Sequence, residues 1–211
     1  MPGVWTIIVA AGSGSRFGGS KLFETLGHQR VLDWSVATAR AASDGVVVVV
    51  PAALADTPGC VAGGATRADS VRCGLAAVPA DAEVVLVHDG ARPFAGGELF
   101  DAVVAAVRAG ADGAVPGVPV TDTVKQVDEI GTVVATLERA ALVAVQTPQA
   151  FRADVLRRAH TTNAEGTDDA SLVEAAGGRV VIVPGDPANR KITVPDDLEW
   201  ARQRVADGVR P

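Results

Sequence analysis

The chain has 211 residues, of which 48% are hydrophobic, and a formal net charge of −6. This acidic balance excludes a general basic face for a nucleic-acid polymer, so any cation-rich site must be local. No stretch approaches 18 uninterrupted apolar residues, and no basic segment precedes a long apolar one near the N-terminus, so we expect no membrane association. Cys60 and Cys73 lack metal-ligand spacing, which suits a reducing compartment and predicts a cytoplasmic protein.

Apolar, β-branched runs alternate with helix-like segments along the chain. Strands are expected at 4–10, 45–50, 83–87, 113–118 and 179–183, and helices at 30–42, 66–77, 96–109, 151–160, 168–176 and 195–207. Continuous apolar runs are typical of strands covered on both faces. The alternation predicts an α/β fold: one domain over residues 1–211 with a Rossmann-like, mostly parallel sheet and helices on both faces.

Residues 119–145 interrupt this alternation. Two strand-like pieces, 123–128 and 132–137, are joined at Glu129-Ile130-Gly131, which predicts a protruding β-hairpin arm. Because two strands alone are marginally stable in water, the arm must pack on its own domain or on another subunit. The pattern leaves both arrangements open.

The first expected strand runs directly into a glycine-rich loop that carries two cations. Gly12, Gly14, Gly18 and Gly19 allow close approach of the backbone, whose N–H groups can face an anion. Arg16 and Lys21 can neutralise charge on a polyphosphate. The loop therefore favours phosphate binding, with an ordinary strand–loop–helix connection as the alternative.

Other polar residues follow later strands, where ligands bind in open α/β sheets. Asp89 suits a divalent cation or a sugar hydroxyl, or else caps a turn, and Arg92 either binds phosphate or pairs with Asp89. The turn at 63–70 suits a flat base and also opens a helix with Thr66 as its N-cap. Thr167 begins a second capped helix start and can offer its hydroxyl to a ligand.

Cations, backbone donors and one carboxylate, without an evident nucleophile or general base, favour nucleotidyl transfer. Mg²⁺ usually bridges the phosphates in such reactions. A dehydrogenase is disfavoured because Phe17 stands at the third glycine of G-x-G-x-x-G, and only Asp33 is a candidate for the expected acid. A non-catalytic nucleotide-binding regulator is the third class considered.

Seven segments occur in the order found in one enzyme family. They are AAGSGSRFGGSK, GGATRADSVRCGL, VHDGARP, VTDTVK, ERAALVAVQTPQAF, TDDASLVEAAGG and NRKITVPDDL, between residues 10 and 198. Each is weak alone, but together they are specific. With them the chain resembles the 2-C-methyl-D-erythritol 4-phosphate cytidylyltransferases of the non-mevalonate isoprenoid pathway.

The resemblance implies transfer of CMP from CTP to the methylerythritol phosphate, with Mg²⁺ and release of pyrophosphate. It implies the catalytic residues Arg16, Lys21 and Lys191, and the nucleotide-binding residues Ala10, Ala11, Gly12, Gly14, Gly64, Ser70 and Asp89, with Asp89 also near the metal. It implies the substrate-binding residues Arg92, Thr123, Arg139, Thr147 and Thr167. In the family the arm crosses to a partner, so a homodimer is implied in which Thr123 and Arg139 serve the neighbouring site.

The chain departs from the usual family pattern at four positions: Val9, Ser20, Gly90 and Arg190. None removes a polar catalytic group, but Arg190 beside Lys191 is expected to add charge near the phosphate site. A related group of enzymes uses ribitol 5-phosphate as acceptor, and this remains the alternative substrate.

Overall fold

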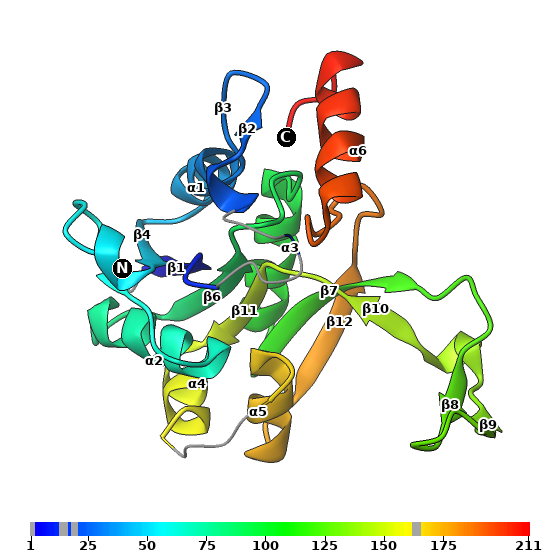
Figure 1. The fold of residues 1–211 in the computed structure, drawn as a ribbon. Helices are drawn as coiled ribbons and strands as arrows, with labels where there is room; N and C mark the ends of the chain where they lie inside the picture. The colour runs from blue at the N-terminus through cyan, green and yellow to red at the C-terminus, as the bar shows by residue number, and fades with distance from the viewer. Residues whose placement is uncertain (1–2, 13–16, 18–20, 162–165) are drawn as a thin grey trace.

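The computed structural model describes residues 3–12, 17, 21–161 and 166–211, so Gly14 and Arg16 lie outside the described part. Its central sheet has the strand order β10-β7-β11-β6-β1-β4-β5, and β12 pairs with β7 (Figure 1). The strands are β1 (Val4–Val9), β4 (Gly45–Val50), β5 (Cys60–Ala62), β6 (Val84–Asp89), β7 (Gly113–Pro119), β10 (Val143–Val145), β11 (Gln149–Arg152) and β12 (Val180–Pro184). The expected α/β fold with a mainly parallel sheet is confirmed.

Most of the parallel part of the sheet is built by strands that the sequence predicts, except β5, which pairs in parallel with β4. β1 pairs in parallel with both β4 and β6, and β12 pairs in parallel with β7. The strands β5, β10 and β11 were not expected, and β11 lies antiparallel between β6 and β7. The helix expected at 151–160 therefore begins only at Ala153, because Phe151 is buried in the sheet opposite Val85 and Gly113.

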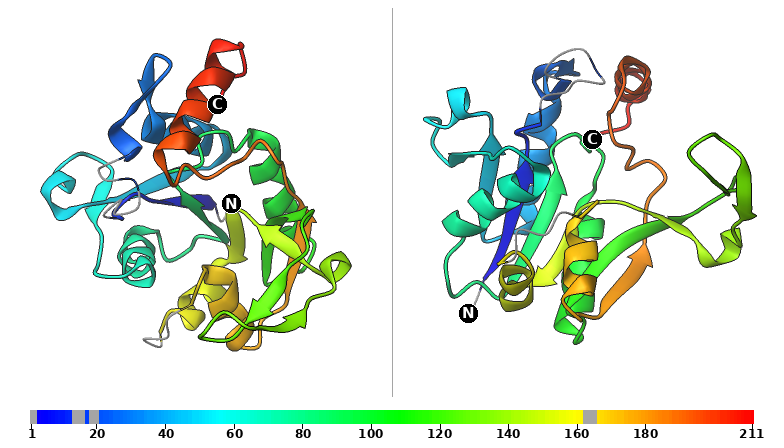
Figure 2. Two further views of the ribbon diagram at one scale, coloured as in Figure 1. Left: turned by 45° about the vertical axis from the view of Figure 1, so that its right-hand side comes forward. Right: turned by 60° about the horizontal axis from the view of Figure 1, so that its bottom comes forward.

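Helices cover both faces of the sheet, as expected (Figure 2). They are α1 (Val31–Ala42), α2 (Arg67–Ala77), α3 (Gly97–Arg108), α4 (Ala153–Ala159), α5 (Asp169–Ala175) and α6 (Pro195–Ala206). Side chains alternate between the faces: Ile8 packs in the core with α1, α3 and α6, and Ile7 packs in the core with α2, α4 and α5. No described helix is long and apolar enough to cross a membrane.

Short elements complete the fold. A small hairpin, β2 (Thr25–Leu26) and β3 (Gln29–Arg30), precedes α1, and the described residues also form the 3₁₀ turns η1 (Lys21–Phe23), η2 (Ala52–Leu54) and η3 (Arg139–Ala141).

The arm is formed by β8 (Lys125–Val127) and β9 (Val133–Thr136), which lie inside the two predicted pieces. It projects from the end of the sheet, beyond β7 and β10 (Figures 1 and 2). Apolar side chains are exposed on it, with Ile130 89% and Val134 56% accessible. The arm thus carries apolar surface that the rest of this chain leaves uncovered.

Candidate functional site

The carboxyl ends of the strands bring distant segments to one edge of the sheet. Val9 at the end of β1 pairs with Asp89 at the end of β6, and Val50 at the end of β4 pairs with Ala62 at the end of β5. β7 runs in the same direction as β6, because both are antiparallel to β11. The described residues that directly follow β1, β5, β6 and β12 therefore share this edge (Figure 1).

The turn after β5 packs tightly against the start of the glycine loop. A Cβ on Gly63 would lie 2.3 Å from the Cβ of Ala11 and 2.9 Å from Ser70 Oγ. A Cβ on Gly64 would lie 2.2 Å from the Cβ of Asp69. Only glycine fits at either position, so the structure places Ala11, Gly63 and Ser70 in one contact region.

Neighbouring backbone contacts hold this region in place. The N–H of Ala10 donates to the carbonyl of Val49 at 2.7 Å, and the hydroxyl of Ser70 donates to the carbonyl of Thr66 at 3.0 Å. Thr66 is the N-cap of α2, as expected, and forms a capping box with Asp69. These bonds fix the end of β1 and the start of α2 separately, and the packing at Gly63 brings the two together.

Asp89 is the last residue of β6, rather than the first residue of a loop, and it is only 8% exposed. Lys191 Nζ lies 2.7 Å from its Oδ2, Arg92 Nε 3.9 Å from the same oxygen, and Arg67 Nε 3.7 Å from Oδ1. Burial raises the pKa of this carboxyl, but the charges of Lys191, Arg67 and Arg92 outweigh it and lower the pKa to about 2. Asp89 is therefore an ionised carboxylate surrounded by cations.

Arg67, Asp169 and His160 join this cluster without having been predicted as site residues. Arg67 Nη1 donates to Asp169 Oδ2 at 2.8 Å, and His160 Nε2 lies 3.1 Å from Asp169 Oδ1. Asp169 has no exposed surface. The pKa of Arg67 is raised, because its burial is outweighed by the charges of Asp169 and Asp89.

The sequence explains both acids of the Thr167-Asp168-Asp169 segment as first-turn residues of a helix. In the structure Asp168 is the N-cap and accepts from Ser171 N at 3.0 Å, whereas Asp169 points inward to Arg67. Thr167 precedes the cap and is exposed. No local pattern separates the inward acid from the capping one.

A second set of contacts fastens the segment that carries Lys191. Thr147 Oγ1 accepts from the N–H of Asp89 at 3.0 Å and lies 3.1 Å from His88 Nδ1. Asn189 Nδ2 donates to the carbonyl of Thr147 at 2.9 Å, and Arg92 Nη1 donates to the carbonyl of Asn189 at 2.7 Å. The structure thus brings Asp89, Arg92, Thr147 and Lys191 together, and Arg92 pairs mainly with this segment.

Arg190 was expected to add charge at the phosphate site, but its side chain is directed to another part of the fold. Its Nη2 lies 2.8 Å from Asp197 Oδ1, and its guanidinium stands 5.4 Å from the ring centroid of Trp200. Both partners belong to α6. Arg190 therefore ties the segment to α6, because its charge is already paired there.

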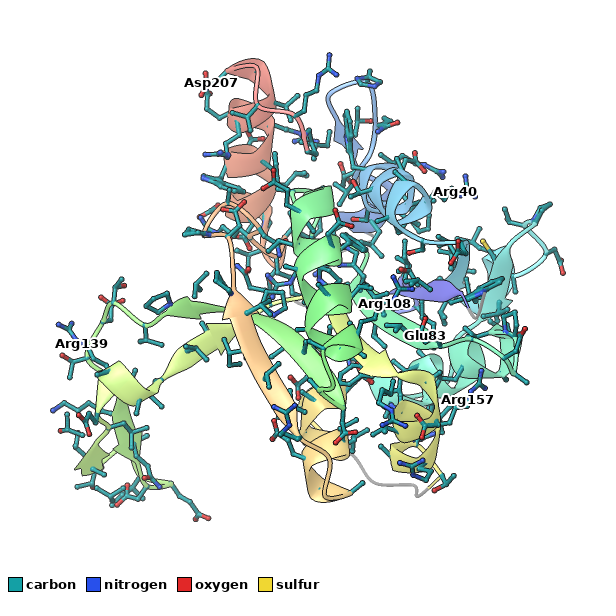
Figure 3. The ribbon with its side chains drawn as sticks, turned by 180° about the vertical axis from the view of Figure 1, so that it is seen from behind. Arg40, Glu83, Arg108, Arg139, Arg157 and Asp207 are labelled. Carbon is teal, nitrogen blue, oxygen red and sulfur yellow. The ribbon has the colours of Figure 1, made fainter. Side chains whose placement is uncertain are left out.

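The remaining predicted residues lie elsewhere. Arg139 is on the projecting arm, where its Nη1 donates to the carbonyl of Thr121 at 2.6 Å (Figure 3). Thr123 is exposed in the segment that leads into β8, and Lys21 begins η1. Among the described residues, no hydrogen bond or ion pair joins Thr123 or Arg139 to the Asp89 cluster of the same chain.

Among the described residues there is no group of three His, Cys, Asp or Glu side chains placed to hold a metal ion. Asp89 offers a single ionised carboxylate, and Mg²⁺ is commonly held by one or two carboxylates together with substrate phosphates. The donor set therefore fits a metal that arrives with a triphosphate, and does not fit a metal held by protein ligands alone.

Comparisons with known proteins agree with the resemblance. A family model for 2-C-methyl-D-erythritol 4-phosphate cytidylyltransferase matches residues 4–206. The enzyme of that name from Rhodococcus jostii is 46% identical over 220 residues, which cover 98% of this chain and 96% of that one. A bifunctional enzyme IspD/IspF from Anaeromyxobacter dehalogenans is 47% identical, and the match covers 96% of this chain but 58% of that longer protein. The crystal structure of the cytidylyltransferase from Thermus thermophilus superposes with a TM-score of 0.81 at 34% identity, over 95% of this chain and 98% of that one.

Proposed function

This chain belongs to the 2-C-methyl-D-erythritol 4-phosphate cytidylyltransferase family, and we propose that its reaction takes place at the strand-end cluster around Asp89. The activity is transfer of the cytidylyl group from CTP to 2-C-methyl-D-erythritol 4-phosphate in isoprenoid biosynthesis. The observation that supports the location is the buried, ionised Asp89 with Lys191 2.7 Å away at the ligand-binding edge of the sheet.

The acceptor phosphate is already ionised at neutral pH, so its attack on the α-phosphorus of CTP needs no general base. A bond forms to that phosphorus as pyrophosphate departs. The enzyme therefore contributes by positioning the substrates and stabilising the developing charge. We assign this charge stabilisation to Arg16, Lys21 and Lys191. The side chain of Lys191 is 36% exposed, which supports an exchange of its partner from Asp89 to a phosphate oxygen.

The nucleotide side of the site is assigned to the end of β1 and the start of α2. The residues are Ala10, Ala11, Gly12, Gly14, Gly64 and Ser70, with Asp89 toward the ribose. The close packing of Gly63 on Ala11 supports this assignment, because it leaves backbone groups rather than side chains facing a flat base. Arg92, Thr147 and Thr167 are assigned to the acceptor side.

Mg²⁺ is the proposed cofactor. When bound to the triphosphate it would neutralise charge on the transferring phosphoryl group. Of the two described carboxylates in the Asp89 cluster, Asp89 keeps some exposed surface whereas Asp169 is fully buried, so Asp89 is the one we assign to the metal.

A homodimer through the arm is proposed for this chain, in a cytoplasmic protein whose residues 1–211 form one nucleotidyltransferase domain. The exposed apolar side chains Ile130, Val133 and Val134 support the dimer, because water-exposed apolar patches mark interaction surfaces. In this arrangement Thr123 and Arg139 bind the acceptor in the partner's site.

Release of pyrophosphate from CTP with Mg²⁺ tests the proposed site. With the methylerythritol phosphate as acceptor, Lys21→Ala should lower kcat roughly 100-fold or more, as expected for loss of one preorganised charged donor, and change the CTP dissociation constant less than threefold. Arg40→Ala, an exposed cation on α1, is the control (Figure 3). Equal losses in turnover and CTP affinity would contradict the transition-state role of Lys21. Faster turnover with ribitol 5-phosphate than with the methylerythritol phosphate would show that ribitol 5-phosphate is the preferred acceptor.

A further inference from the structure

The two oxygens of the Asp89 carboxylate have different surroundings. Oδ2 is contacted by Lys191 at 2.7 Å and approached by Arg92 at 3.9 Å. Oδ1 is approached by Arg67 Nε at 3.7 Å, which is beyond hydrogen-bond length. Within the part of the chain that the structure describes, no hydrogen bond reaches Oδ1. One oxygen of this carboxylate thus receives no hydrogen bond from the described residues and offers an acceptor.

Arg67 is kept at this distance by a stronger partner on its other side. Its Nη1 donates to Asp169 Oδ2 at 2.8 Å, and Asp169 is itself fixed by full burial and by His160 at 3.1 Å. Charge-assisted hydrogen bonds between guanidinium and carboxylate are short and directional, so the position of Asp169 decides where the guanidinium lies. Asp169 therefore sets the gap between Arg67 and Asp89.

We propose that Asp169 is a positioning residue that holds Arg67 away from Asp89 and so keeps Oδ1 available for a substrate hydroxyl. The proposal rests on the assignment of the reaction to the Asp89 cluster. The hydroxyl comes either from the ribose of CTP or from the polyol of the acceptor, and the same chemistry serves both. Arg67 still supplies positive charge that keeps Asp89 ionised.

The physical basis is competition for one oxygen of a largely buried carboxylate. Without the Asp169 charge, the Arg67 guanidinium loses its nearer anion, and Asp89 is the other carboxylate that contacts it. A shift of about 1 Å brings Nε into hydrogen-bond range of Oδ1. The substrate hydroxyl must then displace a charge-assisted bond, and its binding weakens.

The test compares Asp169→Asn with the double variant Arg67→Met/Asp169→Asn. The introduced amide keeps an acceptor for His160 but removes the charge, so we expect the KM of one substrate to rise roughly tenfold, the size expected for one hydrogen bond to a charged group. In the double variant the competing guanidinium is gone, and that KM should return to within about threefold of the parent value. Separate KM values for CTP and for the acceptor identify which hydroxyl uses Oδ1.

A loss of folded enzyme lowers kcat without moving KM, so KM separates positioning from a structural role. Asp154→Asn is the matched control: Asp154 is also a first-turn acid, on α4, and pairs with exposed arginines. Arg67→Lys keeps a cation for Asp169 and should raise KM less than Asp169→Asn does. This variant provides a second test of the proposal if Asp169→Asn folds poorly.

Three outcomes would overturn the inference. They are unchanged KM values in folded Asp169→Asn, a double variant as impaired as the single one, and an Arg67→Lys variant as impaired as Asp169→Asn. Asp89→Asn tests the site assignment separately from the role of Asp169. If Asp89→Asn leaves both KM values unchanged, the assignment of the reaction to the Asp89 cluster fails.

Discussion

At the scale of single residues, a neutral imidazole lies beside an ionised carboxylate. His88 has no exposed surface, and its Nδ1 lies 3.1 Å from Thr147 Oγ1. Burial lowers the pKa of His88 to about 4, from the usual 6.5. Between these two values the unfolded chain binds a proton that the folded chain does not, so the folded state loses stability as the pH falls below 6.5.

The resulting prediction is a pH-dependent free energy of unfolding. Between pH 7 and pH 4.5 it should fall by about 2 to 3 kcal/mol through His88 alone, measured by urea unfolding. His88→Gln should flatten this dependence, whereas His28→Gln, on an exposed turn, should keep it. The lowered pKa of Asp89 adds a further loss only below about pH 4. A dependence that persists unchanged in His88→Gln would exclude this explanation.

The site residues differ in how far the sequence predicts them. Asp89 is predicted because it directly follows an apolar strand, and Lys191 because it lies in the NRKIT segment that carries the family resemblance. Asp169 is not predicted, because a first-turn acid is fully explained by the helix dipole. Its inward direction depends on the packing of α5 near α2, which joins residues 102 positions apart in sequence.

At the scale of elements, the contact between β1 and α2 depends on the absence of a side chain at Gly63. A Cβ there would lie 2.3 Å from the Cβ of Ala11, so Gly63→Ala must push Ala11, just beyond β1, away from the turn that precedes α2. We expect at least a tenfold loss of CTP affinity by calorimetry, and a thermal midpoint lowered by several degrees, since overpacking costs about 1–3 kcal/mol.

Gly97→Ala is the matched control for that substitution. Gly97 is the first residue of α3, and a Cβ there meets no heavy atom within 4 Å. It should leave CTP affinity unchanged and preserve the thermal midpoint. If Gly63→Ala binds CTP as the parent does, the end of β1 does not form the nucleotide site.

The elements that the sequence predicts best are those with long apolar runs. β1, β4, β6, β7 and β12 each consist largely of such runs, and their ends agree with expectation within two residues. β10 and β11 are not predicted, because strands of three and four residues show too little alternation to be distinguished from loop or helix. β11 pairs with both β6 and β7, and β10 pairs with the other side of β7, so long-range contacts rather than local pattern determine both strands.

At the scale of the whole molecule, the residues assigned to the reaction lie in two separate places, the sheet edge and the arm. Lys191 and Asp89 lie at the edge of the central sheet, whereas Arg139 lies on the arm that projects from it (Figure 3). The sequence predicts the hairpin, but the position of its partner surface is not encoded in local pattern. The arm either serves its own site or completes the site of a second copy.

Mixing two inactive variants distinguishes these arrangements. Lys191→Ala damages the body of a site and Arg139→Ala damages an arm, so each homodimer is impaired. In a mixed dimer with exchanged arms, the body of the Arg139→Ala subunit receives an intact arm from the Lys191→Ala subunit, and one of its two sites is complete. Random re-association of equal amounts makes half the dimers mixed, so the mixture should regain about a quarter of parental pyrophosphate release. If each arm serves its own site, no mixed dimer holds a complete site, and the mixture stays as inactive as its components.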